Sequence, residues 1–90
     1  MNYTPVTVIS ATTTSWGKPS SHTFNAARIE SESNCAYLFE QTKREIDKLG
    51  FEISPGSTII DGDRHYTCHE VQSSLFCKKN LICAIVKPVA

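Results

Sequence analysis

The sequence predicts an α+β domain: a two-layer sandwich in which one helix packs on one face of an antiparallel sheet of four to five strands, in the order ββαβββ. Three observations predict it, namely alternating segments rich in β-branched residues, one segment with helical spacing, and turn residues between them. The 90 residues suffice for one domain, residues 1–90, and 40% hydrophobic with 20% charged residues is typical of a folded chain.

The first third of the chain predicts a long hairpin. Residues 3–14 are rich in β-branched side chains, and alternation places Val6 and Val8 on one side of the strand. Residues 22–30 form the second strand, in which a change of phase between apolar positions predicts a bulge. Trp16 and Pro19 lie in the loop between the two strands, a region of turn-forming residues.

Residues 33–49 predict the single helix. Ser33 or Asn34 is placed to cap its start. Gly50 lies where a left-handed residue ends many helices, and Phe51 is placed to fold back onto the last turn as in a Schellman motif. The apolar face predicted to pack on the sheet recurs at spacings of three and four, at Cys35, Leu38, Phe39, Thr42, Ile46 and Leu49.

The remaining strands follow the helix. Asp61 and Gly62 form a dipeptide suited to a type I′ turn, so residues 57–60 and 64–71 are predicted to pair as a second hairpin. Residues 75–77 form a short apolar segment between polar stretches, and residues 81–86 form the last strand before Pro88 stops the pairing.

Charge and hydropathy limit the classes of function. Nine basic and nine acidic residues give no net charge, which disfavours nucleic acid or an anionic membrane as a partner. Residues 1–29 are slightly basic, because they carry Lys18 and Arg28 and no carboxylate. No apolar run reaches the roughly 20 residues that a membrane span needs, and the first ten residues read as a strand rather than a signal peptide. These patterns predict a soluble cytoplasmic protein.

One cluster of soft-metal ligands stands in the second half of the chain. It lacks the Cys-x-x-Cys spacing of zinc sites, and strand alternation sends His65 and His69 to one face and Cys68 to the other unless a bulge intervenes. We therefore expect no metal and no cofactor, with cysteine pairing left open. The candidate ligands are His65, Cys68, His69, Cys77 and Cys83.

No spacing of residues indicates a catalytic site, so the sequence favours a non-enzymatic protein-interaction module. It would be a regulator or inhibitor that masks a partner protein, as accessory proteins of phages or mobile elements do, acting as a monomer or homodimer. Partner contact is expected at Thr14, Trp16 and Lys18, unless Trp16 folds over the sheet edge. The alternatives are a metal-binding or redox protein, a nucleic-acid-binding sheet, and an enzyme whose site needs a homodimer.

Overall fold

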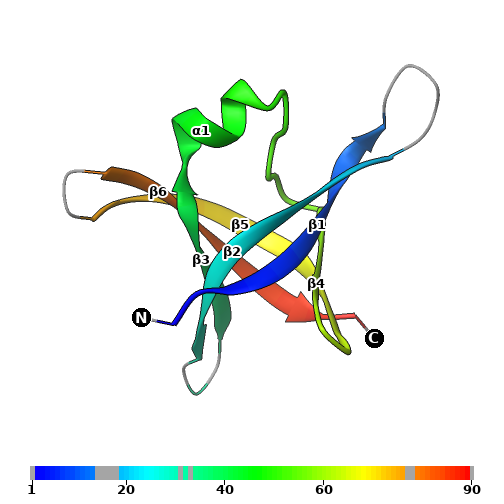
Figure 1. The fold of residues 1–90 in the computed structure, drawn as a ribbon. Helices are drawn as coiled ribbons and strands as arrows, with labels where there is room; N and C mark the ends of the chain where they lie inside the picture. Colours follow the sequence, from blue (N-terminus) through cyan, green and yellow to red (C-terminus); the bar gives the residue numbers. More distant parts are fainter. Residues whose placement is uncertain (1, 14–18, 31, 33, 77–78, 90) are drawn as a thin grey trace.

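A computed structural model describes residues 2–13, 19–30, 32, 34–76 and 79–89. The chain forms a closed barrel of six strands in the order β1-β2-β3-β6-β5-β4, with one short helix (Figure 1). The elements are β1 (Thr4–Thr13), β2 (Pro19–Glu30), β3 (Cys35–Thr42), α1 (Lys43–Lys48), β4 (Thr58–Asp61), β5 (Arg64–Phe76) and β6 (Lys79–Pro88).

The predicted fold class is wrong. The protein is not a two-layer α+β sandwich, because the sheet closes on itself and packs its inner face into its own core, with only six residues in the helix. Two three-strand meanders build the barrel, β1-β2-β3 before the helix and β4-β5-β6 after it. Their first strands pair antiparallel (β1 with β4), and so do their third strands (β3 with β6), which closes the ring.

The amino-terminal hairpin is confirmed. β1 pairs antiparallel with β2, with Val6 opposite Phe24 and Val8 opposite His22. Val6 and Val8 both face the core and are at most 1% exposed, as alternation predicts. The register shift lies between Ile9 and Thr13 on β1, however, and not on the second strand, where the sequence predicted a bulge.

The predicted helix over residues 33–49 is wrong in its first half. Residues 35–42 form β3, in which Tyr37 and Phe39 point into the barrel and are fully buried. The helix begins after Thr42, whose hydroxyl accepts a hydrogen bond from the Glu45 amide at 3.2 Å while the Glu45 carboxylate accepts from Thr42, a capping box. Ser33 and Asn34 therefore do not cap it.

The end of the helix is as predicted. Leu49 is the C-cap residue and Gly50 follows with φ of 70°. The Gly50 amide donates to the Asp47 carbonyl at 3.0 Å and the Phe51 amide to the Ile46 carbonyl at 3.4 Å, the two bonds of a Schellman motif. Ile46 is buried as expected, whereas Leu49 is 55% exposed and does not pack on the sheet.

The carboxy-terminal strands differ in length from the prediction. β4 and β5 form the expected hairpin, but its two-residue loop is Gly62 and Asp63 and not the predicted Asp61 and Gly62, with φ of 60° at Gly62. The apolar segment at residues 75–77 is not a separate strand, since residues 75 and 76 continue β5 to Phe76. A bulge at His69, between the Cys68 and Glu70 pairings, lets Cys68 and Val71 both face the core.

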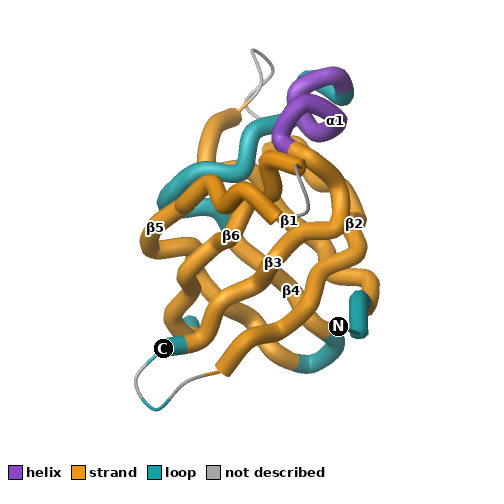
Figure 2. The backbone as a smooth tube through the Cα atoms, turned by 90° about the vertical axis from the view of Figure 1, so that its left-hand side faces the viewer, coloured by secondary structure: helices purple, strands orange, loops and turns teal. Residues whose placement is uncertain are grey.

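The antiparallel order gives the barrel two distinct ends. α1 covers one of them, called here the helix end (Figure 2), and Ile46 reaches from it into the core. The strand termini at the helix end are Thr13, Pro19, Thr42, Thr58, Phe76 and Lys79. Both chain termini lie toward the other end. In the described part of the chain, no helix is long and apolar enough to span a membrane.

Candidate functional site

The helix end holds a groove of about 610 Å³ between α1, the segment that follows it, and the β5–β6 hairpin. Its floor is apolar, because Ile46, Phe51 and Ile53 from one side meet Val71 and Ile82 from the other. Polar groups form its rim, among them Lys43, Asp47, Glu52, Ser54 and Ser73. An apolar floor with a few polar groups is the usual composition of a ligand site, and this volume lies within the range of such sites.

The Schellman motif creates the groove. By reversing the chain at Gly50 it brings Phe51 and Ile53 back under the helix, where they are 4% and 5% exposed. The Phe51 ring packs against Phe24 and, edge-on, against His22, at centroid distances of 5.5 and 4.8 Å. The sequence predicted this turn correctly but gave no sign that a groove follows from it.

The segment before β4 is fixed to β5 at one point. The Cys68 amide donates to the Ser57 carbonyl at 2.7 Å, and the Gly56 amide donates to the Cys68 carbonyl at 2.8 Å. Beyond the bulge at His69, β5 pairs only with β6 among the described residues. The stretch from Glu70 to Phe76 therefore has an open backbone edge, and the groove runs beside it at Val71 and Ser73.

A second cluster of polar groups lies toward the other end of the barrel. The buried Tyr37 hydroxyl donates to Asp61 Oδ2 at 2.7 Å, and its ring is tilted against Tyr66 at 5.7 Å. Arg28 donates to the Tyr66 hydroxyl at 3.2 Å and forms an ion pair with Glu30. These contacts tie β2, β3, β4 and β5 together, so the cluster has a structural role in closing the barrel.

The electrostatics of this cluster follow from burial and hydrogen bonds. Burial raises the pKa of Tyr37 well above its usual value, and the Asp61 carboxylate raises it further. The Cys35 side chain, through a hydrogen bond, raises the pKa of Arg28, which burial opposes. Tyr37 therefore remains a hydrogen-bond donor, and Arg28 a fixed cation, at every physiological pH.

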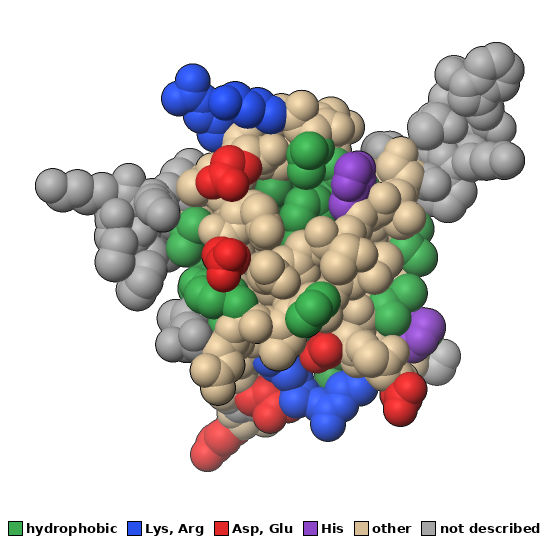
Figure 3. All heavy atoms as spheres, in the orientation of Figure 1, with side chains coloured by type: hydrophobic (Ala, Val, Ile, Leu, Met, Phe, Trp, Pro, Cys, Tyr) green, Lys and Arg blue, Asp and Glu red, His purple; other side chains and the backbone are tan. Residues whose placement is uncertain are grey.

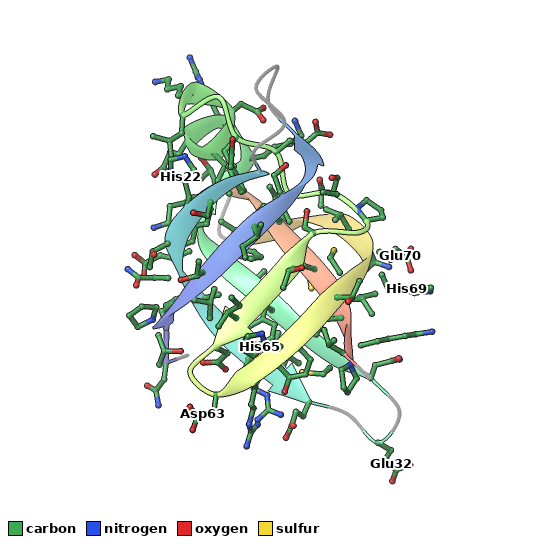
Figure 4. The ribbon with its side chains drawn as sticks, turned by 90° about the vertical axis from the view of Figure 1, so that its right-hand side faces the viewer. His22, Glu32, Asp63, His65, His69 and Glu70 are labelled. Atoms are coloured by element: carbon green, nitrogen blue, oxygen red, sulfur yellow. The ribbon has the colours of Figure 1, made fainter. Side chains whose placement is uncertain are left out.

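The candidate metal ligands do not come together in the described part of the chain. His65 and His69 are exposed at separate places on β5 (Figure 4), whereas Cys68 is buried in the core and Cys83 lies on the outer face of β6. No three His, Cys, Asp or Glu side chains among the described residues are placed to hold a metal ion. Cys77 lies outside the described residues, and Cys35, Cys68 and Cys83 are free.

The predicted partner contacts Thr14, Trp16 and Lys18 lie outside the described residues. They belong to the link between β1 and β2, whose flanking residues Thr13 and Pro19 lie at the helix end. Lys43, on the groove's rim, was not predicted as a site residue. Its ammonium forms an i,i+4 ion pair with Asp47 at 3.0 Å.

Charge is strongly segregated along the chain although its sum is zero. All nine carboxylates fall between Glu30 and Glu70, together with four of the nine basic residues, which gives this part a net charge of −5. Residues 1–29 and 71–90 hold the other five basic residues and no carboxylate, a net charge of +5. Figure 3 shows basic side chains over α1 with acidic side chains directly beneath them, and a mixture of both signs toward the other end.

Comparison of the chain with protein-family models, curated proteins and solved structures finds no match in any of the three.

Proposed function

We propose that this protein binds single-stranded nucleic acid along the helix end of the barrel. The observation that carries the proposal is the charge segregation. The hairpins β1–β2 and β5–β6 both terminate at the helix end. Most of these two hairpins lies within residues 1–29 and 71–90, and the only charged residues in those two segments are basic. The distribution of charge, rather than its sum, decides whether a chain can bind phosphates.

The chemistry of the hairpins suits a phosphate backbone. Lysine ammonium groups release condensed counterions when they neutralise phosphates, and this release supplies most of the affinity of sequence-independent binding. Lys18 lies in the sequence between β1 and β2, and Lys78 and Lys79 lie at the junction of β5 and β6. These two hairpins contain two carboxylates, of which Glu30 ends β2 at the opposite end of the barrel and Glu70 lies near the middle of β5.

Bases also need apolar surface on which to stack. The groove at the helix end offers an apolar floor, and the sequence of the two hairpins adds Trp16 and Phe76. Small antiparallel barrels, such as the OB-fold, bind oligonucleotides on their strands and loops. That likeness of architecture is an analogy, and the argument for function depends on the charges and the groove.

The experiment is a titration of fluorescein-labelled oligo-dT with the protein, followed by fluorescence anisotropy at several salt concentrations. We expect log K to fall linearly with log salt, with a slope of about −0.7 per phosphate contacted. Lys18→Ala should weaken binding and reduce that slope by about 0.7. Since Trp16 is the single tryptophan, its emission should also be quenched if a base stacks on it.

Arg64→Ala is the matched control, because it removes one exposed cation from the opposite end of the barrel. It should leave both the affinity and the salt slope unchanged. Absence of binding at about 50 mM salt, where such contacts are strongest, contradicts the proposal. An equal loss of affinity in Arg64→Ala and Lys18→Ala would also contradict it.

A second candidate function is supported by the open edge of β5. An extended peptide of a partner protein can add as a strand to an unpaired edge, with its side chains in the neighbouring groove. The protein would then be the non-enzymatic regulator or inhibitor that its size and composition favour. The two candidates differ in salt dependence, because strand addition depends on backbone hydrogen bonds and apolar contacts and is little affected by salt.

A further inference from the structure

The open edge of β5 presents specific backbone groups to the groove. The amide and carbonyl of Cys68 both bond to the segment before β4, so they point to that side of β5. Residues of one strand whose side chains share a face also direct their amides and carbonyls to the same edge. Past the bulge at His69, Val71 and Ser73 have inward side chains as Cys68 does, because both pair with core residues of β6. Their amides and carbonyls therefore point to the open edge, where no described residue bonds to them.

A tight turn leads the chain away from this edge. The Ser57 amide donates to the Ser54 carbonyl at 3.0 Å, and Gly56 has φ of 94°. Pro55 and Gly56 thus occupy the two central positions that a type II turn prefers. β4 starts directly after this turn and pairs only with the first part of β5. The sheet position in line with β4, beside Glu70–Phe76, is therefore not covered by the described chain.

The accessible rim of the groove has an excess of negative charge. Lys43 and Asp47 form an ion pair at 3.0 Å and offset each other. Glu52 also lines the groove, is exposed, and has no partner among the described residues. Pro55 is exposed and Val71 half-buried, so a bound segment contacts these side chains rather than the buried floor. The rim therefore suits a cation that is flanked by apolar side chains.

We propose that the open edge of β5 binds an extended peptide of a partner protein, with a lysine or arginine between apolar residues at alternate positions. The peptide adds antiparallel to β5 in line with β4, exchanges backbone hydrogen bonds with Val71 and Ser73, and places its cation beside Glu52. This inference rests on the second candidate function, strand addition, and names its ligand. It does not depend on the binding of phosphates by the hairpins.

The ligand is tested with an array of capped, fluorescein-labelled peptides Thr-X-Thr-X-Thr-X-Thr, in which each X is valine, lysine or glutamate. Fluorescence anisotropy measures their affinity at protein concentrations up to about 1 mM. We expect the tightest binding with one lysine between valines. Binding should be at least about fivefold weaker when glutamate replaces that lysine, because it sets like charges beside each other.

Glu52→Lys should reverse this preference, so that the glutamate peptide binds more tightly than the lysine peptide. The matched control is Glu32→Lys, which makes the same change of charge at an exposed carboxylate toward the opposite end of the barrel (Figure 4). It should leave the preference for lysine unchanged. Circular dichroism verifies that each variant is folded.

Backbone pairing is tested separately by N-methylation of the peptide. In an antiparallel pair the amides of the X residues face β5, so methyl groups on two of them should weaken binding at least about tenfold. The same change at two threonines, whose amides face away, should leave binding unchanged. In the protein, Ser73→Pro removes one edge amide but no hydrogen bond to β6 and should weaken binding as well. Gln72→Ala is its control, since the Gln72 side chain is exposed and its amide faces β6.

An array in which no peptide binds overturns the proposal, as does equal binding of the two methylated peptides, which would mean that the peptide does not pair with β5. Pairing without any preference for lysine over glutamate refutes the ligand and leaves strand addition standing. A wild-type chain that dimerises without peptide, and is monomeric as Ser73→Pro, would assign the edge to a second copy. Loss of oligo-dT binding in Ser73→Pro, with no peptide bound, would assign it to nucleic acid.

Discussion

Among single residues, Tyr37 combines a fully buried ring with a polar hydroxyl group that needs a hydrogen-bond partner. Its ring is fully buried and its hydroxyl has one partner among the described residues, Asp61, at 2.7 Å. Tyr37→Phe should lower the free energy of unfolding by about 1.5–3 kcal/mol, the usual contribution of a hydrogen bond to a charged group. Urea denaturation at pH 7 measures it. Asp61→Asn keeps an acceptor and should cost less; a loss within about 0.5 kcal/mol in Tyr37→Phe would contradict this role.

The role of a single residue could be predicted from the sequence only where neighbouring positions in the chain determine it. Alternation identified Val6 and Val8 as core residues because it requires only neighbouring positions. The role of Tyr37 could not be predicted, since its partner is 24 residues away on a strand whose register no local pattern specifies. The groove residue Val71 was missed for a similar reason, because a bulge at His69 determines which way it points.

At the level of elements, β3 shows how a strand can imitate a helix. Tyr37 and Phe39 are buried in the barrel, while Leu38 between them is buried from the outer face. A strand that is apolar on both faces produces spacings of three and four by chance, and Ile46 in the following helix extends the pattern. The capping box at Thr42 and Glu45 was the local signal that places the start of the helix correctly.

The Schellman turn that ends α1 leads to a prediction about the stability of variants at Gly50. Gly50 has φ of 70° and an added Cβ would meet no atom within 4 Å, so backbone strain alone opposes a side chain there. Gly50→Ala should therefore lower the free energy of unfolding by about 1–2 kcal/mol. Gly50→Asn, which tolerates this conformation better, should cost less. Equal losses in the two variants, measured by urea denaturation, would mean that the cost has another cause.

At the level of the whole molecule, both hairpins were predicted and the closure was not. Each hairpin is specified by residues close in sequence, such as the turn at Gly62. Closure depends on β1 pairing with β4 and β3 with β6, contacts between segments about 50 residues apart. An open sheet covered by a helix would show the same alternation along each strand, so the sequence pattern alone could not distinguish the two.

The closed core also makes stability depend on pH in the alkaline range. Burial raises the pKa of Cys68 from 9.0 to about 11, and it raises the pKa of Cys83 and of Tyr37 as well. Because the folded state favours the neutral forms, their contribution is fully present below the unfolded pKa values. It is lost as the pH rises through the folded ones, when the unfolded chain releases protons first.

We therefore expect the free energy of unfolding to be flat from pH 7 to about 8.5 and to fall between about pH 9 and 11, with Cys68 contributing about 2–3 kcal/mol of that loss. Urea denaturation across this range measures the slope. Cys68→Ala should be less stable at pH 7, because it leaves a cavity in the core, yet its stability should fall less steeply with pH. Parallel pH profiles in the two proteins would show that the Cys68 thiol does not titrate differently in the folded and unfolded states.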